Sequence, residues 1–222
     1  MTLTEIRTAL ASRGLRPLKQ LGQNFLHDQN LAAWMAERAV EGLRPHALVV
    51  EIGPGLGALT EFILKRDLRL IALEKDRGLC LFLRERFPAE MAQGRFDLRE
   101  GDALEMLPNL GTVPEVICGN LPYYISTPLL MECLRLTGAS ARLFFLVQKE
   151  VGQRLASPSG GKTYGALSVL VQAGYKVTVE RTLPGSVFYP PPEVESVVVR
   201  LTPLPAPLIQ PEERERFIAI VQ

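Results

Sequence analysis

The feature that most constrains the fold of this chain is a regular alternation of short apolar segments with amphipathic helical ones. Strand character is found at residues 47–52, 69–74, 96–100, 115–120, 142–148, 175–180 and 195–201. Most of these segments are apolar throughout, as parallel strands covered by helices on both faces must be. Helices are expected near residues 58–66, 76–86, 127–137, 149–156 and 165–173. This order predicts an α/β fold with a doubly wound, mostly parallel sheet.

A helix before the first strand is predicted from its cap and its apolar side. The carboxylate of Asp28 can accept hydrogen bonds from the free amides of a helix N-terminus. Leu31, Trp34, Met35 and Ala39 then fall on one side of that helix. We expect this side, with the only tryptophan of the chain, to lie in the core.

The C-terminal part departs from the alternation. The last two strand segments are joined by residues 181–194 without a helix long enough for a crossover, which predicts antiparallel pairing at an edge of the sheet. Residues 201–207 form a proline-rich linker, and residues 211–222 have the pattern of the first turns of another helix. Its apolar side chains belong to Phe217, Ile218 and Val221. Because a single helix cannot bury such a face alone, we expect the start of a small C-terminal helical domain.

The composition excludes several classes of protein. No apolar run approaches the ~18 residues that a membrane span needs, and the first residues lack the apolar core of a secretory signal. We therefore expect a cytoplasmic protein with no membrane partner, and we also expect a monomer. Cys80, Cys118 and Cys133 lie far apart and are expected to be buried, and His27 and His46 are the only histidines. No metal site is predicted.

The net charge of +1 conceals two basic segments. Residues 1–24 carry Arg7, Arg13, Arg16 and Lys19, and the second segment carries Arg142, Lys149, Arg154 and Lys162. Each segment alone can be a solvated surface, whereas together they can follow a phosphate backbone. Basicity alone does not identify a protein that binds nucleic acid.

A glycine-rich segment follows the first strand and opens a helix. In Glu51-Ile-Gly-Pro-Gly-Leu-Gly-Ala-Leu-Thr60, Gly53 and Gly55 let the backbone turn sharply and approach a ligand closely. Glu74 ends the second strand, where its carboxylate can accept both hydroxyls of a ribose. This pattern does not choose the cofactor, because Gly53-x-Gly55-x-x-Ala58 also fits the dinucleotide fingerprint.

Asp102 follows the third strand, so a second carboxylate projects from the same edge of the sheet. It can accept a hydrogen bond from the adenine amine of an adenosyl cofactor. A dehydrogenase has no general need for an acid there, which favours S-adenosylmethionine over NAD. Asp102 can equally cap a helix over residues 103–107.

The segment Asn120-Leu-Pro-Tyr123, at the end of the fourth strand, is the most specific motif of the chain. Its residue types suit an adenine N6 amine, which is a poor nucleophile because its lone pair is delocalised into the ring. The Asn120 side-chain oxygen and the Leu121 carbonyl can accept the two amine hydrogens and so favour a localised lone pair. Pro122 stiffens the turn, and Tyr123 offers a face on which a purine can stack.

Five segments in order over residues 19–202 carry a resemblance to a known family. They are Gln23-Asn-Phe-Leu26, Glu51–Thr60, Asn120-Leu-Pro-Tyr-Tyr-Ile-Ser126, Gln148-Lys-Glu150 and Phe188-Tyr-Pro-Pro-Pro-Glu-Val194. Together they resemble the rRNA adenine N6,N6-dimethyltransferases, in particular those of the small subunit. The resemblance implies a class I methyltransferase fold, Rossmann-like, with a seven-stranded sheet that has one antiparallel strand. It implies S-adenosylmethionine as cofactor, and small-subunit (16S) rRNA and the immature 30S subunit as partners. The implied reaction is dimethylation of two adjacent adenosines near the 3′ end of that rRNA.

The resemblance also assigns individual residues to the donor and the target. The donor positions are Asn24 and Leu26 over the methionine end, Gly53 beneath it, Glu74 on the ribose, Asp102 on the adenine and Asn120 at the target amine. Phe188 matches the aromatic residue that faces the target base opposite Tyr123. Tyr124 departs from the family, because many members have Asn or His there, and we expect a change in the target pocket.

The resemblance implies three parts of the chain. Residues 1–27 form a basic segment that closes over the donor site, residues 28–202 the catalytic domain, and residues 203–222 the linker and the start of the C-terminal domain. Other interpretations remain: a large-subunit rRNA adenine N6-methyltransferase of the macrolide-resistance type, or mainly a ribosome-assembly factor. An NAD-dependent oxidoreductase is disfavoured, because no second substrate domain or hydride-transfer acid is evident.

Overall fold

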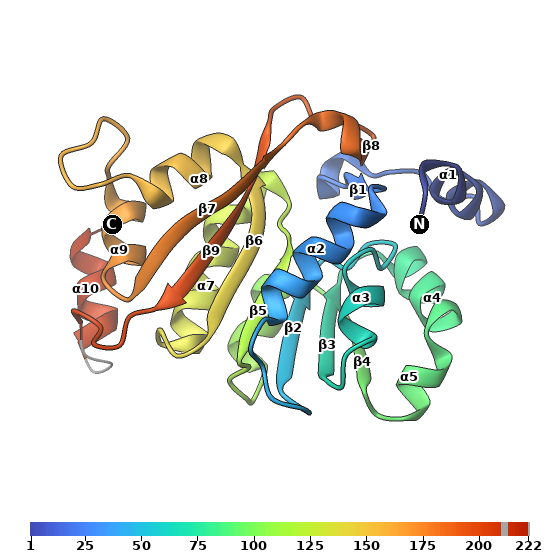
Figure 1. The fold of residues 1–222 in the computed structure, drawn as a ribbon, viewed down its shortest axis with the longest axis horizontal. Helices are drawn as coiled ribbons and strands as arrows, with labels where there is room; N and C mark the ends of the chain where they lie inside the picture. The colour runs from blue at the N-terminus through green and yellow to red at the C-terminus, as the bar shows by residue number, and fades with distance from the viewer. Residues whose placement is uncertain (210–212, 222) are drawn as a thin grey trace.

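The central feature of the structure, a computed structural model that describes residues 1–209 and 213–221, is a seven-stranded sheet (Figure 1). Its strands are β2 (Leu48–Ile52), β3 (Arg69–Glu74), β4 (Phe96–Glu100), β5 (Val116–Asn120), β6 (Arg142–Gln148), β7 (Tyr175–Leu183) and β9 (Ser196–Pro203). They are ordered β4-β3-β2-β5-β6-β9-β7, and β9 alone is antiparallel to its neighbours β6 and β7. The predicted sheet, with its antiparallel pair at one edge, is confirmed.

Helices cover both faces of the sheet, and each face has its own core. The first face carries α1 (Leu3–Ser12), α2 (Gln29–Val40), α3 (Thr60–Leu64), α4 (Arg77–Arg86) and α5 (Pro88–Ala92). The second carries α6 (Ala103–Met106), α7 (Ser126–Thr137), α8 (Lys149–Ala156), α9 (Ala166–Gln172) and α10 (Arg214–Val221). Neighbouring residues of one strand, such as Val49 and Val50, belong to opposite cores because side chains alternate across a strand. This arrangement explains why the inner strands β2, β5 and β6 are almost entirely apolar, whereas the edge strands β4 and β7 also carry exposed polar residues.

The helix predicted from its cap begins where expected. The Asp28 carboxylate accepts a hydrogen bond from the Leu31 amide at 2.9 Å, and Leu31, Met35 and Ala39 are buried. Trp34 is a correction, because it is only half-buried at the edge of the first core. Trp34 packs against the first core on one side, and the guanidinium of Arg181 lies 5.6 Å from the centre of its ring.

The N-terminal segment belongs to the first core. Ile6, Ala9 and Leu10 of α1 are buried there. A short helical turn, η1 (Lys19–Leu21), leads to β1 (Phe25–Leu26), which pairs antiparallel with β8 (Phe188–Tyr189) outside the main sheet. The two family segments that contain Leu26 and Phe188 are therefore joined in space.

Among the described residues, the C-terminal helix α10 spans Arg214–Val221 and lies beside α9 (Figure 1). Ile218 is 5% exposed and is part of the second core. The expectation that this helix finds no partner in the chain is wrong for that side chain, since the catalytic domain covers it. Residues 211, 212 and 222 of the predicted helix lie outside the described residues.

The structure also bears on the cysteines, on membrane-spanning helices and on metal-binding clusters. Cys80, Cys118 and Cys133 are buried free thiols, as predicted. Within residues 1–209 and 213–221, no helix is both long and apolar enough to cross a membrane. Over the same residues, no group of three or more His, Cys, Asp or Glu side chains is placed to hold a metal ion.

Candidate donor and methyl-transfer site

A cavity opens at the carboxyl ends of β2, β3 and β5, where an open α/β sheet binds its ligands. Its empty volume is about 660 Å³ including its open mouth. Gly53 and Gly55, with φ of +64° and +60°, form its floor. A β-carbon on Gly55 would lie 3.3 Å from the Phe25 ring, so the close approach of these two segments requires glycine. The turn predicted from the glycine-rich segment is present.

Glu74, at the end of β3, is held between two backbone amides. Its carboxylate oxygens accept hydrogen bonds from the amides of Gly55 at 3.1 Å and Asp76 at 2.9 Å. The residue is 6% exposed, and this burial raises its pKa to about 6 against the opposing effect of those bonds. Each oxygen takes one amide and keeps a lone pair for a ligand hydroxyl.

Asp102 both caps a helix and lines the cavity. One carboxylate oxygen caps α6 by accepting from the Leu104 amide at 2.9 Å, while the residue also forms part of the cavity wall. The other oxygen lies 2.7 Å from Nζ of Lys75. The hydrogen bond from Lys75 lowers the pKa of Asp102, so this acid carries its charge beside the cavity.

The N-terminal segment forms one wall of the cavity through residues 21–25. The Asn120 amide nitrogen donates to the backbone carbonyl of Asn24 at 2.9 Å, which ties this wall to the end of β5. The Asn24 side chain donates to the Gly22 carbonyl at 3.1 Å. Leu26 is 6% exposed and lines a smaller neighbouring hollow, which it shares with Asn24 and Asn120.

The segment Asn120–Tyr123 leaves the sheet at the edge of the cavity. The Leu121 amide still donates to the Leu146 carbonyl of β6 at 3.1 Å, so the strand geometry extends one residue beyond Asn120. Pro122 lines the cavity, whereas the Tyr123 hydroxyl is hydrogen-bonded to the Ser196 hydroxyl of β9. Burial raises the pKa of Tyr123. Its ring therefore lies on the β9 side of the motif.

Phe188 is placed differently from a residue that stacks on a base. It pairs with Leu26 in the small sheet, is 2% exposed and belongs to the first core. Its neighbour Tyr189 is more accessible, and the Arg7 guanidinium lies 5.1 Å from the centre of the Tyr189 ring. In this conformation Phe188 offers almost no surface to an adenine, and its contact with the target base stays a prediction.

Sequence reasoning missed Lys75 in the cavity wall and Glu51 in the smaller neighbouring hollow. Lys75 directly follows Glu74 at a strand end, a position that could have indicated it. Glu51 appears in the sequence only as part of the glycine-rich segment, yet it is 1% exposed and accepts from the Thr60 hydroxyl at 2.6 Å. Burial raises the pKa of Glu51 to about 7. An acid inside an otherwise apolar strand is the signal that could have found it.

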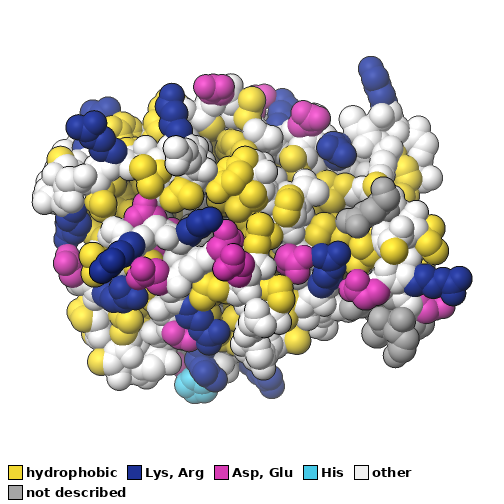
Figure 2. Space-filling model, turned by 180° about the vertical axis from the view of Figure 1, so that it is seen from behind, with side chains coloured by type: hydrophobic (Ala, Val, Ile, Leu, Met, Phe, Trp, Pro, Cys, Tyr) yellow, Lys and Arg dark blue, Asp and Glu magenta, His cyan; other side chains and the backbone are white. Residues whose placement is uncertain are grey.

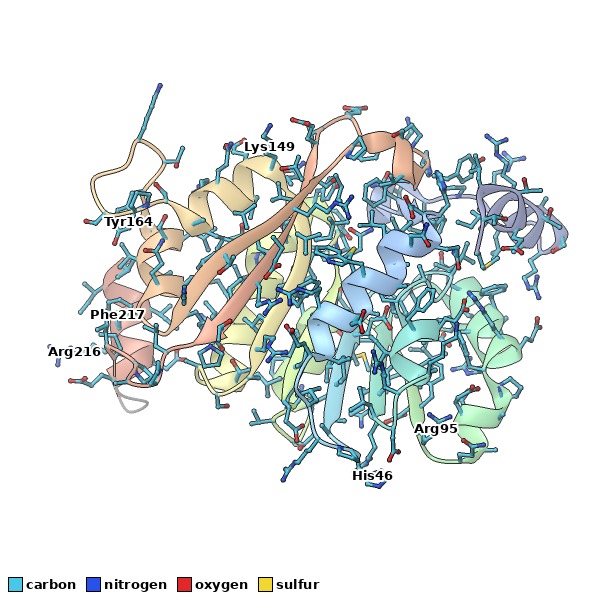
Figure 3. The ribbon with its side chains drawn as sticks, viewed as in Figure 1. His46, Arg95, Lys149, Tyr164, Arg216 and Phe217 are labelled. Atoms are coloured by element: carbon cyan, nitrogen blue, oxygen red, sulfur yellow. The ribbon has the colours of Figure 1, made fainter. Side chains whose placement is uncertain are left out.

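The second basic segment does not form one continuous surface. Lys149 follows β6 at the edge of the sheet that carries the cavity, whereas His46 and Arg95 mark the opposite edge (Figure 3). Arg142 begins β6, about 20 Å from Lys149 by the rise of a strand, and its guanidinium donates to the carbonyls of Ala39 and Glu41. On the second face, basic and acidic side chains are intermixed (Figure 2). Arg142 thus has a structural role.

The fold and this site define a class I S-adenosylmethionine-dependent methyltransferase. The cavity combines a glycine floor with the buried carboxylate of Glu74 and the charged carboxylate of Asp102, groups that can accept the hydroxyls and the amine of an adenosyl group. Residues 15–222 match the family of ribosomal RNA adenine dimethylases, and the chain belongs to that family.

Named relatives and solved structures agree with this assignment. Ribosomal RNA small subunit methyltransferase A of Moorella thermoacetica is 43% identical over 223 residues, 95% of this chain and 75% of the relative. The protein of the same name from Geobacter metallireducens is 39% identical, over 96% and 78%. The crystal structure of 23S rRNA methyltransferase ErmE superposes with a TM-score of 0.71 at 26% identity, over 89% and 77%. A dimethyladenosine transferase from Plasmodium falciparum gives 0.68 at 27% identity, over 81% and 63%.

Proposed function

We propose that this chain transfers methyl groups from S-adenosylmethionine to the N6 amines of two adjacent adenosines near the 3′ end of small-subunit (16S) rRNA. In this proposal it works as a monomer in the cytoplasm, on the immature 30S subunit. The relatives named ribosomal RNA small subunit methyltransferase A support the choice of rRNA. The observation that carries the proposal is the position of Asn120, which ends β5 where the donor cavity meets the turn Asn120–Tyr123.

The donor is assigned to the residues that line the cavity. Glu74 would accept the ribose hydroxyls and Asp102 the adenine amine, while Gly53 and the wall around Asn24 would hold the methionine end. When bound, S-adenosylmethionine supplies a methyl group on a positively charged sulfur. The protein then has to hold and orient both partners, since proximity and alignment supply most of the acceleration.

Asn120 is fixed in the orientation that an amine acceptor requires. The Asn24 carbonyl can only accept, so the atom of the Asn120 amide that faces it must be the nitrogen. The side-chain oxygen is therefore turned away from Asn24, and none of the hydrogen bonds among the described residues uses it. We assign this oxygen and the Leu121 carbonyl as the acceptors of the two N6 hydrogens. Holding both hydrogens keeps the nitrogen lone pair localised.

The neighbouring residues keep this arrangement rigid. The Leu121 side chain is 1% exposed, and its amide is bound to β6, so its carbonyl cannot turn freely. Pro122 follows with a fixed φ of −57°. Tyr123 is assigned to stacking on the target adenine, which has to leave its own stack to reach the donor.

The test is methyl transfer with labelled S-adenosylmethionine to unmethylated 30S subunits and to 23S rRNA, followed by nucleoside analysis. We expect N6,N6-dimethyladenosine in 16S rRNA alone, and loss of that product with Asn120→Ala. Label confined to 23S rRNA would identify the large-subunit activity, which the likeness to ErmE keeps as the second candidate. Binding to 30S subunits without any transfer would leave an assembly factor and refute the proposed reaction.

A further inference from the structure

Gln23 joins the N-terminal wall of the cavity to the end of β3. Its side-chain oxygen accepts from the Leu18 amide at 2.8 Å, which closes the turn of the wall. Its side-chain nitrogen donates to a carboxylate oxygen of Asp76 at 2.9 Å, a residue 53 positions away in the sequence. Both polar ends of the side chain are thus used within the protein, although Gln23 also lines the cavity.

Asp76 carries this link onward to the proposed ribose acid. Its second carboxylate oxygen caps α4 through the amides of Gly78 at 2.8 Å and Leu79 at 3.2 Å, so the side chain cannot rotate without uncapping the helix. Its backbone amide donates to Glu74 at 2.9 Å. The other Glu74 oxygen accepts from Gly55 at 3.1 Å. A continuous path of hydrogen bonds therefore runs from the wall to the glycine floor.

We propose that Gln23 is a positioning residue for the donor, which sets the place of the wall relative to Glu74 through its bond to Asp76. The inference rests on the proposed donor site and adds a residue to it. A wall without this bond is still tied to Asn120 through Asn24, so the chain folds, but residues 18–23 lose their anchor on β3. Donor binding must then order that segment and becomes weaker, because ordering a mobile segment opposes binding.

The first experiment compares Gln23→Ala with Gln20→Ala by calorimetric titration of S-adenosylmethionine. Gln20 lies exposed on the same short turn, and its side chain makes no hydrogen bond with the described residues, so it controls for the loss of an amide. We expect Gln23→Ala to raise the dissociation constant about tenfold, the effect of one hydrogen bond to a charged group. Gln20→Ala should match the wild type. The turnover of Gln23→Ala at saturating donor should also be retained, because Gln23 does not touch the target.

The second experiment exchanges the donor and acceptor across the bond. Gln23→Glu places two carboxylates against each other, and Asp76→Asn places an amide where an acceptor is needed. The double variant restores complementarity, because the new amide at position 76 can donate to the new carboxylate at position 23. The oxygen of that amide can still cap α4, since asparagine is a good helix cap. We expect each single variant to bind the donor about tenfold more weakly and the double variant to recover most of the wild-type affinity.

The outcomes separate the inference from the donor site itself. A wild-type chain that does not bind S-adenosylmethionine refutes the donor site. A wild-type chain that binds, with Gln23→Ala equal to Gln20→Ala or with no recovery in the double variant, refutes the role of Gln23. A fall in turnover at saturating donor, together with a matching loss of thermal stability in the ligand-free protein, shows a structural role only and also overturns the inference.

Discussion

Donor affinity should depend on pH through Glu74. Burial raises the pKa of this acid to about 6, whereas the Lys75 hydrogen bond lowers the pKa of Asp102, which therefore stays ionised while Glu74 titrates. Ribose hydroxyls bind the ionised form of Glu74, so affinity is lost as the pH falls through 6. At pH 5 about one molecule in ten has Glu74 ionised, and the apparent dissociation constant rises by the reciprocal of that fraction. We expect binding at pH 5 to be about tenfold weaker than at pH 8.

The assay is calorimetric titration of S-adenosylmethionine between pH 5 and 8, on the wild type and on Glu74→Gln. The glutamine side chain has the size of glutamate but cannot titrate. The affinity of Glu74→Gln for S-adenosylmethionine should therefore lack the pH dependence that Glu74 causes in the wild type. At pH 8 this variant should bind about tenfold more weakly, because bonds to a charged acceptor are lost. Burial raises the pKa of Glu51 to about 7, so titration of Glu51 is the other possible cause of a pH-dependent donor affinity. An equal pH dependence in Glu74→Gln, or none in the wild type, would refute the assignment of Glu74.

Three further predictions follow from the site and the core. Asn120→Ala should lower the turnover number about 10²-fold, in the range of other lost transition-state hydrogen bonds, with a much smaller change in donor affinity by calorimetry. Tyr123→Leu should reduce kcat/KM for rRNA by the factor that corresponds to ~1–3 kcal/mol of base stacking. Phe188→Leu should match that loss only if the buried Phe188 ring becomes exposed to the target base when rRNA binds, and wild-type kinetics of Phe188→Leu would remove Phe188 from the target pocket. Glu51 has its pKa raised from 4.5 to about 7, so its contribution to stability is complete below pH 4.5 and is lost as the pH rises through 7. Between pH 4.5 and 8, the free energy of unfolding of the wild type, measured in urea, should fall by about 3 kcal/mol more than that of Glu51→Gln. An equal fall in both proteins would contradict the raised pKa of Glu51.

Most of the sheet is predictable because its inner strands are covered on both faces and therefore consist of consecutive apolar residues. The ends of the strands are predictable for the same reason, which places Gly53, Glu74, Asp102 and Asn120 at one edge from the order of residues alone. The structure brings these four residues together around one cavity. Parallel strands impose this, because their carboxyl ends all lie on the same side of the sheet.

Side chains outside the strands are less predictable, because their surroundings come from distant parts of the chain. Phe188 is buried by its pairing with Leu26, far away in the sequence, and no local pattern reports that pairing. The burial of Ile218 is equally hard to predict. The sequence shows that its helix is amphipathic, but not that Ile218 packs in the second core. Trp34 packs against the first core as its helical position predicts, but it is only half-buried, and the Arg181 guanidinium lies over its ring.

The two neighbouring tyrosines show how the turn after β5 separates the donor from the target. Tyr123 is bound to Ser196 of β9 and does not line the donor cavity, whereas Tyr124 does line it and is 55% exposed. A β-carbon on Gly22 of the N-terminal wall would lie 3.6 Å from the Tyr124 ring, so this ring stands where the two walls meet. The departure from the family at Tyr124 was expected to change the target pocket. In the structure Tyr124 lines the donor cavity instead, because Tyr123 and Tyr124 are successive residues of the 3-10 turn Tyr123–Ile125 and their side chains point about 120° apart.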